Sequence, residues 1–287
     1  MSIWEAIILG IVEGLTEYLP VSSTGHLIIT RYLLQLSDGD AQKAFEICIQ
    51  GGAILAVLGI YFQRVKAIFT DTIAWLRTRK EANVPQELPA GMRLALNVII
   101  GFLPAAVIGV ILSQYIKGYL FNAPVVTTMW ALGGLVILLY VRARKKSGKG
   151  FQGKSLEELS YSGALKVGFM QCIAMCPGVS RSLMTMLGGL CAGLSVSAAV
   201  EFSFLLGLIT LGAATVHDAY EYGHAMITDI GWGPIIVGTL TAWVSAIIAV
   251  KWMVGYLNKH SLAIFGWYRI AAACVMLGLI LFAGLAF

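Results

Sequence analysis

The stretch from Glu13 to His26 reads Glu-Gly-Leu-Thr-Glu-Tyr-Leu-Pro-Val-Ser-Ser-Thr-Gly-His and gathers polar groups within an otherwise strongly apolar sequence. Glu13 and Glu17 lie four residues apart, so they share one face of a helix. Pro20 ends that helix, because proline lacks an N–H group and disfavours helical geometry at the preceding residue. The Ser-Ser-Thr-Gly segment that follows is typical of a turn into a second helix with a hydroxyl at its N-cap. The stretch therefore predicts two helices joined by a polar break.

The composition of the chain indicates the environment of this break. The 287 residues are 58% hydrophobic and 12% charged, and the mean hydropathy is +0.81. A soluble domain carries about 25% charged residues, so the chain is expected to form a single integral membrane domain over 1–287. No cleaved signal peptide is expected, because the N-terminus lacks a basic segment. The net charge of +5 is no nucleic-acid signal, since the basic residues flank apolar stretches. The five cysteines are interpreted as small buried hydrophobes.

Six stretches are apolar over about 20 residues, the length that a bilayer core requires. They are 44–62, 94–113, 124–142, 199–217, 233–251 and 263–285. Two further apolar regions, 3–36 and 163–194, are interrupted by proline and by charged or hydroxyl residues. Non-helical backbone at membrane depth is tolerated where it is buried in protein or lines a watery cavity. We therefore expect an all-α polytopic membrane protein with six transmembrane helices and two re-entrant helical hairpins.

The charges of the loops predict how these helices are oriented. Lys and Arg gather in segments 63–93 and 142–166, and segment 252–262 has Lys259 with Lys251 at its edge, whereas 218–232 has acidic residues and no Lys or Arg and 114–123 has Lys117 alone. The positive-inside rule places the first three loops in the cytoplasm and the other two outside. Six crossings and two non-crossing hairpins satisfy every loop, and both termini then lie outside.

The two halves of the chain, 1–142 and 160–287, resemble each other at sparse positions. With one constant offset, Ala6, Gly10, Glu13 and Ser22 match Ala164, Gly168, Gln171 and Ser180. Ala44 and Glu46 match Ala199 and Glu201, and Ile99-Ile100-Gly101 matches Ile236-Val237-Gly238. Each half has one hairpin and three spans, and because three is odd, the second half is expected to lie inverted. Such an inverted-topology repeat, with broken helices that meet near the midplane, is typical of transporters.

The second hairpin carries Pro177-Gly-Val-Ser-Arg-Ser-Leu-Met-Thr185. An arginine offers a bidentate fork for oxyanions, and hydroxyls and amides at a helix N-terminus add donors, so the segment predicts a phosphate site. The predicted phosphate-binding residues are Arg181, Ser180, Ser182 and Thr185, with Ser22 from the first hairpin. For Thr185 the alternative is a role in close helix packing. For Arg181 that alternative is weak, since an arginine at the midplane costs roughly 2.5–3.5 kcal/mol and requires a partner.

Four carboxylates fall within embedded segments, and Arg181 is their one clear basic counterpart. They are Glu13, Glu17, Glu46 and Glu201. Carboxylates repel phosphate, so a phosphate site built this way predicts a divalent cation, Mg²⁺ or Ca²⁺, with Glu13 and Glu17 as ligands. For Glu46 and Glu201 the alternative is structural, each hydrogen-bonding the backbone of the opposite hairpin.

His26 lies beside Ser22 and Ser23 and near Glu17 in the sequence. A lone histidine in a protein core usually has a structural role, with its ring nitrogens hydrogen-bonded to neighbouring groups. The serines and the carboxylate near His26 favour instead a role as general acid or base. The sequence contains no Walker A motif and no zinc-binding HExxH motif.

These motifs closely resemble the two signature regions of the bacterial undecaprenyl-diphosphate phosphatase family, also known as the bacitracin-resistance phosphatases. The resemblance rests on Glu13-x-x-x-Glu17, Pro20-Val-Ser-Ser-Thr-Gly-His26 and Pro177-Gly-Val-Ser-Arg-Ser-x-x-Thr185. It extends over the whole chain and includes the Glu46–Gln50 region, the Glu201-Phe-Ser-Phe segment and the Tyr268-Arg269 pair.

The resemblance implies hydrolysis of undecaprenyl diphosphate to undecaprenyl phosphate and inorganic phosphate. This reaction recycles the lipid carrier of peptidoglycan synthesis and opposes bacitracin, which sequesters the diphosphate form. The resemblance also implies dependence on a divalent metal, a polyprenyl diphosphate substrate in the bilayer, and an active site open to the outer side of the cytoplasmic membrane. A homodimer is plausible for the family.

The hypothetical mechanism places Arg181, Ser180 and Thr185 on the phosphates. Glu13 and Glu17 hold the metal or orient His26, which acts as acid–base catalyst. The attacking group is Ser23 or water, and the sequence leaves both open. Glu46, Gln50 and Glu201 are supporting residues with lesser evidence.

Two other classes of protein fit the pattern. A transporter or flippase of the lipid carrier, or of an ion-coupled solute, also has inverted repeats and midplane carboxylates. A structural membrane subunit is the third class, but it leaves the embedded ionisable groups without a role.

Overall fold

A computed structural model describes residues 1–36, 39–78, 88–148 and 152–285. The described residues form eleven α-helices and one short 3₁₀ helix, η1. The elements are α1 (Ile3–Thr16), α2 (Ser23–Leu33), α3 (Asp40–Ile60), α4 (Phe62–Thr78), α5 (Ala90–Tyr119), α6 (Ala123–Lys146), η1 (Leu156–Glu158), α7 (Tyr161–Ile173), α8 (Arg181–Cys191), α9 (Val196–Asp229), α10 (Trp232–Leu257) and α11 (Ala263–Ala283). The predicted all-α class is confirmed.

Six of these helices are long and apolar enough to cross a membrane: α3, α5, α6, α9, α10 and α11. They coincide with the six apolar stretches that the sequence predicts, so the chain is a multi-pass membrane protein. Two helices extend well beyond the predicted spans, since α5 continues to Tyr119 and α9 continues to Asp229.

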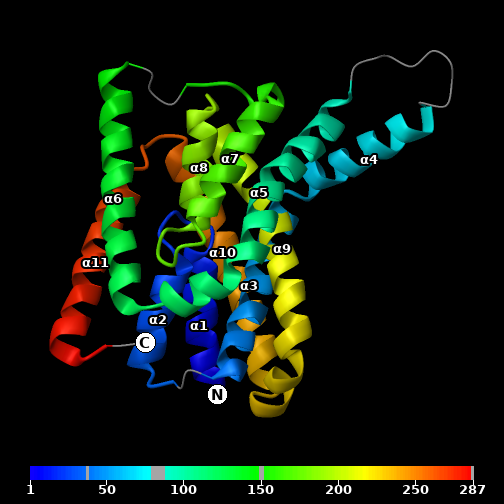
Figure 1. The fold of residues 1–287 in the computed structure, drawn as a ribbon. Helices are drawn as coiled ribbons and strands as arrows, with labels where there is room; N and C mark the ends of the chain where they lie inside the picture. The colour runs from blue at the N-terminus through cyan, green and yellow to red at the C-terminus, as the bar shows by residue number, and fades with distance from the viewer. Residues whose placement is uncertain (37–38, 79–87, 149–151, 286–287) are drawn as a thin grey trace.

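The other helices of the bundle form two broken pairs. α1 and α2 have 14 and 11 residues, and α7 and α8 have 13 and 11, whereas a membrane crossing needs about 20. The turns before α2 and α8 contain Ser22 at φ 71° and Ser180 at φ 82°, in the left-handed region that non-glycine residues rarely adopt. The α1–α2 and α7–α8 hairpins enter from opposite ends of the molecule, and their turns face each other at mid-height (Figure 1).

Glycines set the close packing of both hairpins against long helices. α1 packs along α10, and α7 packs along α5. A Cβ atom at Gly10 would lie 2.4 Å from the carbonyl oxygen of Gly238, and one at Gly168 would lie 2.6 Å from that of Gly101. Any larger side chain would push these backbones apart. Around the hairpins, α3 packs against α9 and α10, and α6 packs against α11.

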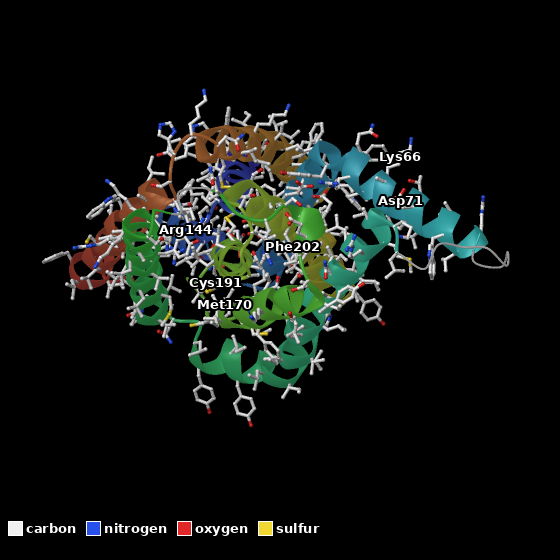
Figure 2. The ribbon with its side chains drawn as sticks, turned by 90° about the horizontal axis from the view of Figure 1, so that it is seen from above. Lys66, Asp71, Arg144, Met170, Cys191 and Phe202 are labelled. Carbon is white, nitrogen blue, oxygen red and sulfur yellow. The ribbon has the colours of Figure 1, made fainter. Side chains whose placement is uncertain are left out.

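α4 is a helix where the sequence predicts only a charged loop, so this part of the prediction is wrong. It packs against α5 and leans away from the bundle (Figure 1). Seen from above, Lys66 and Asp71 lie on this outlying helix, while Phe202 lies near the centre (Figure 2). Phe69 is 63% and Leu76 is 52% exposed. Exposed apolar and basic groups on one helix are typical of a segment at a membrane–water interface.

The connections between the helices sort to two ends of the bundle. Both termini and the α5–α6 and α9–α10 turns lie at one end, whereas η1 and the α10–α11 turn lie toward the other (Figure 1). η1 and the α10–α11 turn, which belong to segments 142–166 and 252–262, therefore lie at the same end of the described part of the chain.

Candidate active site

The turn of the first hairpin brings a hydroxyl onto a carboxylate. Glu17 is the C-cap residue of α1, and Ser23 is the first residue of α2. Ser23 Oγ donates a hydrogen bond to Glu17 Oε2 at 2.6 Å. Because Glu17 is only 8% exposed, this bond lies where water screens it little. A serine held on a buried carboxylate has a ready acceptor for its proton.

Arg181 connects this pair to the second hairpin. Its Nη2 lies 3.0 Å from Glu17 Oε1, and its Nη1 donates to the carbonyl oxygen of Ser203 at 3.3 Å. The guanidinium carbon lies 5.2 Å from the centre of the Tyr18 ring, a cation–π contact. A Cβ atom at Gly207 would lie 2.4 Å from Nη1, so the glycine makes room for the arginine. Tyr18, Ser203 and Gly207 were not predicted from the sequence, because only the folded chain brings them to Arg181.

A cavity opens between the two hairpin turns at this point. It encloses about 560 Å³ of space, part of it open to the outside. Its polar lining consists of Glu17, Ser22, Ser23, Thr24, Gln50, Ser180 and Arg181. Apolar residues complete the wall, among them Phe121, Met175, Pro177 and Leu211. The cavity therefore presents hydroxyls, the Gln50 amide, the Glu17 carboxylate and the Arg181 guanidinium to a ligand, beside apolar side chains.

The remaining hydroxyls of the second hairpin are bonded within the protein. Ser182 Oγ donates to the carbonyl oxygen of Leu19 at 2.8 Å, and Thr185 Oγ1 lies 2.6 Å from Ser203 Oγ. Both Ser182 and Thr185 are 0% exposed. The structure thus places these two residues behind Arg181, where they join the hairpins to each other and to α9. Ser180, which caps α8 and lies 2.9 Å from Ser182 Oγ, lines the cavity.

Glu13 lies one turn before Glu17 on α1 and is 1% exposed. Within the described residues its Oε2 atom has no hydrogen-bond partner. A buried carboxylate oxygen without a donor calls for a proton, a water molecule or a cation. The part of the chain that the structure describes has no group of three His, Cys, Asp or Glu residues that could hold a metal ion. One or two carboxylates suit Mg²⁺, which takes its other ligands from water and phosphate.

His26 lies on α2, and within the described residues its ring nitrogens contact Ser22 and Tyr268 and neither Ser23 nor Glu17. Nδ1 lies 2.7 Å from the carbonyl oxygen of Ser22, and Nε2 lies 2.6 Å from the hydroxyl of Tyr268 on α11. The base nearest to the Ser23 hydroxyl is therefore Glu17. The predicted orientation of His26 by Glu17 is replaced in this structure by contacts with Ser22 and Tyr268.

The three supporting residues occupy different places. Gln50 lines the cavity, and its Oε1 accepts from Thr215 at 3.4 Å. Glu46 forms an ion pair with Arg31 at 3.1 Å, and Glu201 forms one with Arg64 at 2.6 Å. Arg181 is therefore not the one basic counterpart of the embedded carboxylates, and that prediction is wrong. The backbone contacts expected of Glu46 and Glu201 give way to side-chain ion pairs.

Arg269 on α11 is a further polar residue at the meeting point of the hairpins. It is 0% exposed, and it donates to the carbonyl oxygens of Gly178 at 2.7 Å and Pro20 at 3.3 Å. These two carbonyls belong to the turns of the two hairpins. The signal for such a role was present in the sequence, since a charged residue inside an apolar span is expected to have a partner.

Comparison with known proteins identifies relatives over nearly the whole chain. The family model described as bacitracin resistance protein BacA matches residues 6–275. A protein of Acidovorax ebreus named undecaprenyl-diphosphatase is 42% identical over 273 residues, which cover 95% of this chain and 93% of that protein. A protein of Pseudomonas fluorescens with the same name is 41% identical over 280 residues, which cover 96% of this chain and 95% of that protein.

Proposed function

The chain belongs to the bacitracin resistance protein BacA family, and we propose that it acts as an undecaprenyl-diphosphatase. In this reaction undecaprenyl diphosphate and water give undecaprenyl phosphate and inorganic phosphate. The relatives named for this activity cover almost all of both chains. The structural observation that supports the proposal is the cavity in which Ser23 and Arg181 both contact the carboxylate of Glu17.

Arg181 supplies the positive charge that a diphosphate needs. Its Nη groups contact Glu17 and the backbone, whereas its Nε has no hydrogen-bond partner among the described residues. The residue stands at the first position of α8, where backbone N–H groups and the helix dipole favour an anion. The hydroxyls of Ser22 and Ser180 line the same cavity. Arg181 is thus the principal phosphate ligand of the proposed site, and Ser182 and Thr185 support it from behind.

Two routes fit the arrangement around Ser23. In the first, Ser23 Oγ bonds to the terminal phosphorus while its proton passes to Glu17, and the bond from that phosphorus to the bridging oxygen breaks, so that undecaprenyl phosphate leaves. Water then cleaves the phosphoserine and releases inorganic phosphate. In the second, water attacks the terminal phosphorus directly and Glu17 takes its proton. The hydrogen bond from Ser23 Oγ to Glu17 Oε2 favours the first route, because it activates the serine. His26 is proposed as a further acid–base group.

A divalent cation would be held by Glu13, whose Oε2 lacks a donor among the described residues, and by Glu17 once its present contacts loosen. Such an ion would supply charge neutralisation for the phosphate oxygens. The carboxylates otherwise repel the substrate, and the single charge of Arg181 leaves part of the diphosphate charge without a counterpart.

The membrane setting also belongs to the proposal. The lipid tail stays among the membrane-spanning helices, and the diphosphate reaches the cavity between the hairpin turns. We place the protein in the bacterial cytoplasmic membrane with both termini and the cavity entrance on the outer side, because the basic connections lie at the opposite end.

Phosphate release from undecaprenyl diphosphate by the purified protein tests the function. We expect release that a chelator suppresses and that added Mg²⁺ or Ca²⁺ restores. Arg181→Lys keeps the positive charge but loses the bidentate hydrogen bonding of the guanidinium. It should lower kcat/KM by about 100-fold, the usual effect of removing one donor to a developing oxyanion. Arg142→Lys, on the exposed part of α6, is the matched control and should match the wild type.

Two outcomes would contradict these assignments. A folded wild-type protein that releases no phosphate from the lipid would favour a transporter of the carrier over a phosphatase. An Arg181→Lys variant with wild-type turnover would leave the activity in place and remove Arg181 from the site.

A further inference from the structure

The imidazole of His26 is held by groups from three elements. Its Nδ1 lies 2.7 Å from the Ser22 carbonyl oxygen, and its Nε2 lies 2.6 Å from the hydroxyl of Tyr268. The His26 and Tyr268 rings are stacked, with centres 5.6 Å apart and planes 9° apart. Trp130 of α6 adds a third ring contact, with its ring centre at 4.8 Å. The ring therefore has one orientation in the folded protein.

These contacts also determine which nitrogen carries the proton. A backbone carbonyl oxygen can only accept a hydrogen bond, so Nδ1 of His26 must be the protonated nitrogen toward Ser22. In the neutral ring Nε2 is then the acceptor, and the Tyr268 hydroxyl donates to it. A tyrosine hydroxyl can reverse this role and accept once Nε2 is protonated. Tyr268 can therefore remain bonded to His26 in both protonation states.

We infer that Tyr268 is a positioning residue for His26: the Ser22 carbonyl oxygen fixes the Nδ1–H tautomer, and the Tyr268 hydroxyl holds Nε2, the nitrogen that exchanges a proton. This inference rests on the proposed function, because it assigns the reacting nitrogen of an acid–base group in that reaction. The single proton site of Nε2 faces the Tyr268 hydroxyl, so Tyr268 passes a proton to or from Nε2 by giving up one proton as it takes another. Its effect on turnover passes through the imidazole, which it orients from a helix 242 positions along the chain from His26.

A second stacked tyrosine–histidine pair allows the effect of ring stacking to be distinguished from that of the hydrogen bond between the Tyr268 hydroxyl and His26. The rings of Tyr256 and His260 lie 4.5 Å apart with planes 13° apart. There the Nδ1 atom of His260 faces the backbone carbonyl oxygen of Tyr256 at 3.3 Å, and the tyrosine hydroxyl takes no part in the contact. Tyr256→Phe is therefore the matched control for Tyr268→Phe, since both variants retain a stacked aromatic ring.

The tautomer can be measured directly by nitrogen NMR of the full-length protein with ¹⁵N-labelled histidine in nanodiscs. The chain has 4 histidines, and the signals that vanish in His26→Gln belong to His26. We expect Nδ1 protonated and Nε2 unprotonated but hydrogen-bonded in the wild type. In Tyr268→Phe the Nε2 signal should move to the position of a nitrogen without a donor, while Tyr256→Phe leaves it unchanged. An Nε2 signal that Tyr268→Phe does not move would overturn the inference.

Turnover supplies the second readout. Tyr268→Phe should lower kcat about tenfold, the factor expected for one hydrogen bond, with little change in KM. In a His26→Gln background the same substitution should have no further effect, because residues that act through one another are not additive. Equal losses in both backgrounds would mean that Tyr268 acts independently of His26 and would overturn the inference. A wild-type protein without phosphate release would contradict the proposed function instead, and the NMR result would stand apart from it.

Discussion

The buried side chain of Arg269 donates hydrogen bonds to α6 and to the turns of both hairpins. Its hydrogen bonds go to backbone carbonyl oxygens, those of Gly178, Met129, Trp130 and Pro20. A buried cation is tolerated when its donors are satisfied in this way. The same bonds hold the turns of both hairpins against α6. Arg269 therefore joins three parts of the chain that are far apart in the sequence.

Replacement of this arginine should loosen the hairpins. Arg269→Met keeps much of the apolar stem but leaves the carbonyls of Gly178 and Met129, now bonded at 2.7 and 2.9 Å, without this donor. Hydrogen bonds from a charged group contribute about 1.5–3 kcal/mol each, so the free energy of unfolding should fall by about 3 kcal/mol or more. Thermal unfolding in detergent measures this as a lower midpoint, with Arg142→Met on the exposed part of α6 as control. Equal midpoints for Arg269→Met and wild type would refute the role.

The residues of the site differ in how far the sequence could predict them. Glu17, Ser23 and Arg181 were predictable as a group, because polar side chains at two helix breaks in an apolar chain are costly unless they form a site. The bond from Ser23 to Glu17 was not, since it depends on the left-handed backbone at Ser22. The orientation of His26 was not predictable either, because its partner Tyr268 comes from the last helix.

At the scale of elements, the contacts of the two hairpins support the inverted repeat that the sequence predicts. Gly10 and Gly168 are matched positions, and so are Gly238 and Gly101. The structure packs Gly10 on Gly238 and Gly168 on Gly101, so each hairpin meets the matching helix of the other half. We propose that the two halves interlock as inverted copies, with each half supplying one side of the cavity.

If this proposal is right, the two glycine contacts should respond alike to an added methyl group. Gly10→Ala and Gly168→Ala each place a Cβ atom within 2.6 Å of a backbone oxygen. Overpacking of this kind costs about 1–3 kcal/mol, so both variants should unfold at a lower temperature. Gly212→Ala is the control, because a Cβ there meets nothing within 4 Å, and it should be neutral or stabilising. Destabilisation by only one of the two hairpin variants would contradict their equivalence.

The elements themselves were predictable to the extent that hydropathy determines them. The six spans follow from apolar stretches of bilayer length, and the breaks at Pro20 and Pro177 follow from the loss of a backbone donor. α4 was missed because its charged residues, such as Arg64 and Lys66, suggested a loop. The partner that stabilises its first turn, Glu201 on α9, is 137 positions away, and no local pattern indicates it.

At the scale of the whole molecule, the two matched carboxylates each pair with an arginine, although the two arginines lie on unmatched helices. Glu46 pairs with Arg31 of α2, and Glu201 pairs with Arg64 of α4. Arg64 also contacts Glu157 of η1 at 3.0 Å, so this second pair is anchored at the end that carries the basic connections. Each ion pair thus ties a long helix to a neighbouring shorter helix. Lys and Arg are more numerous at one end of this helix bundle than at the other. By the positive-inside rule, that difference in charge determines which end faces the cytoplasm.

The same charge asymmetry predicts the side from which the cavity is reached. In a variant with its 5 cysteines replaced, single cysteines at Ser2 and at Asp229 should react with a membrane-impermeant maleimide in intact spheroplasts. A cysteine at Asn258, in the α10–α11 turn, should react only after the membrane is permeabilised. The positive-inside rule requires this pattern because Lys259 lies in that turn and Lys251 lies in the last two turns of α10, whereas segment 218–232 around the α9–α10 turn has no Lys or Arg. Labelling in denaturant shows that each cysteine can react. The opposite pattern would place the first hairpin and the mouth of the cavity on the cytoplasmic side, where the proposed orientation does not allow them.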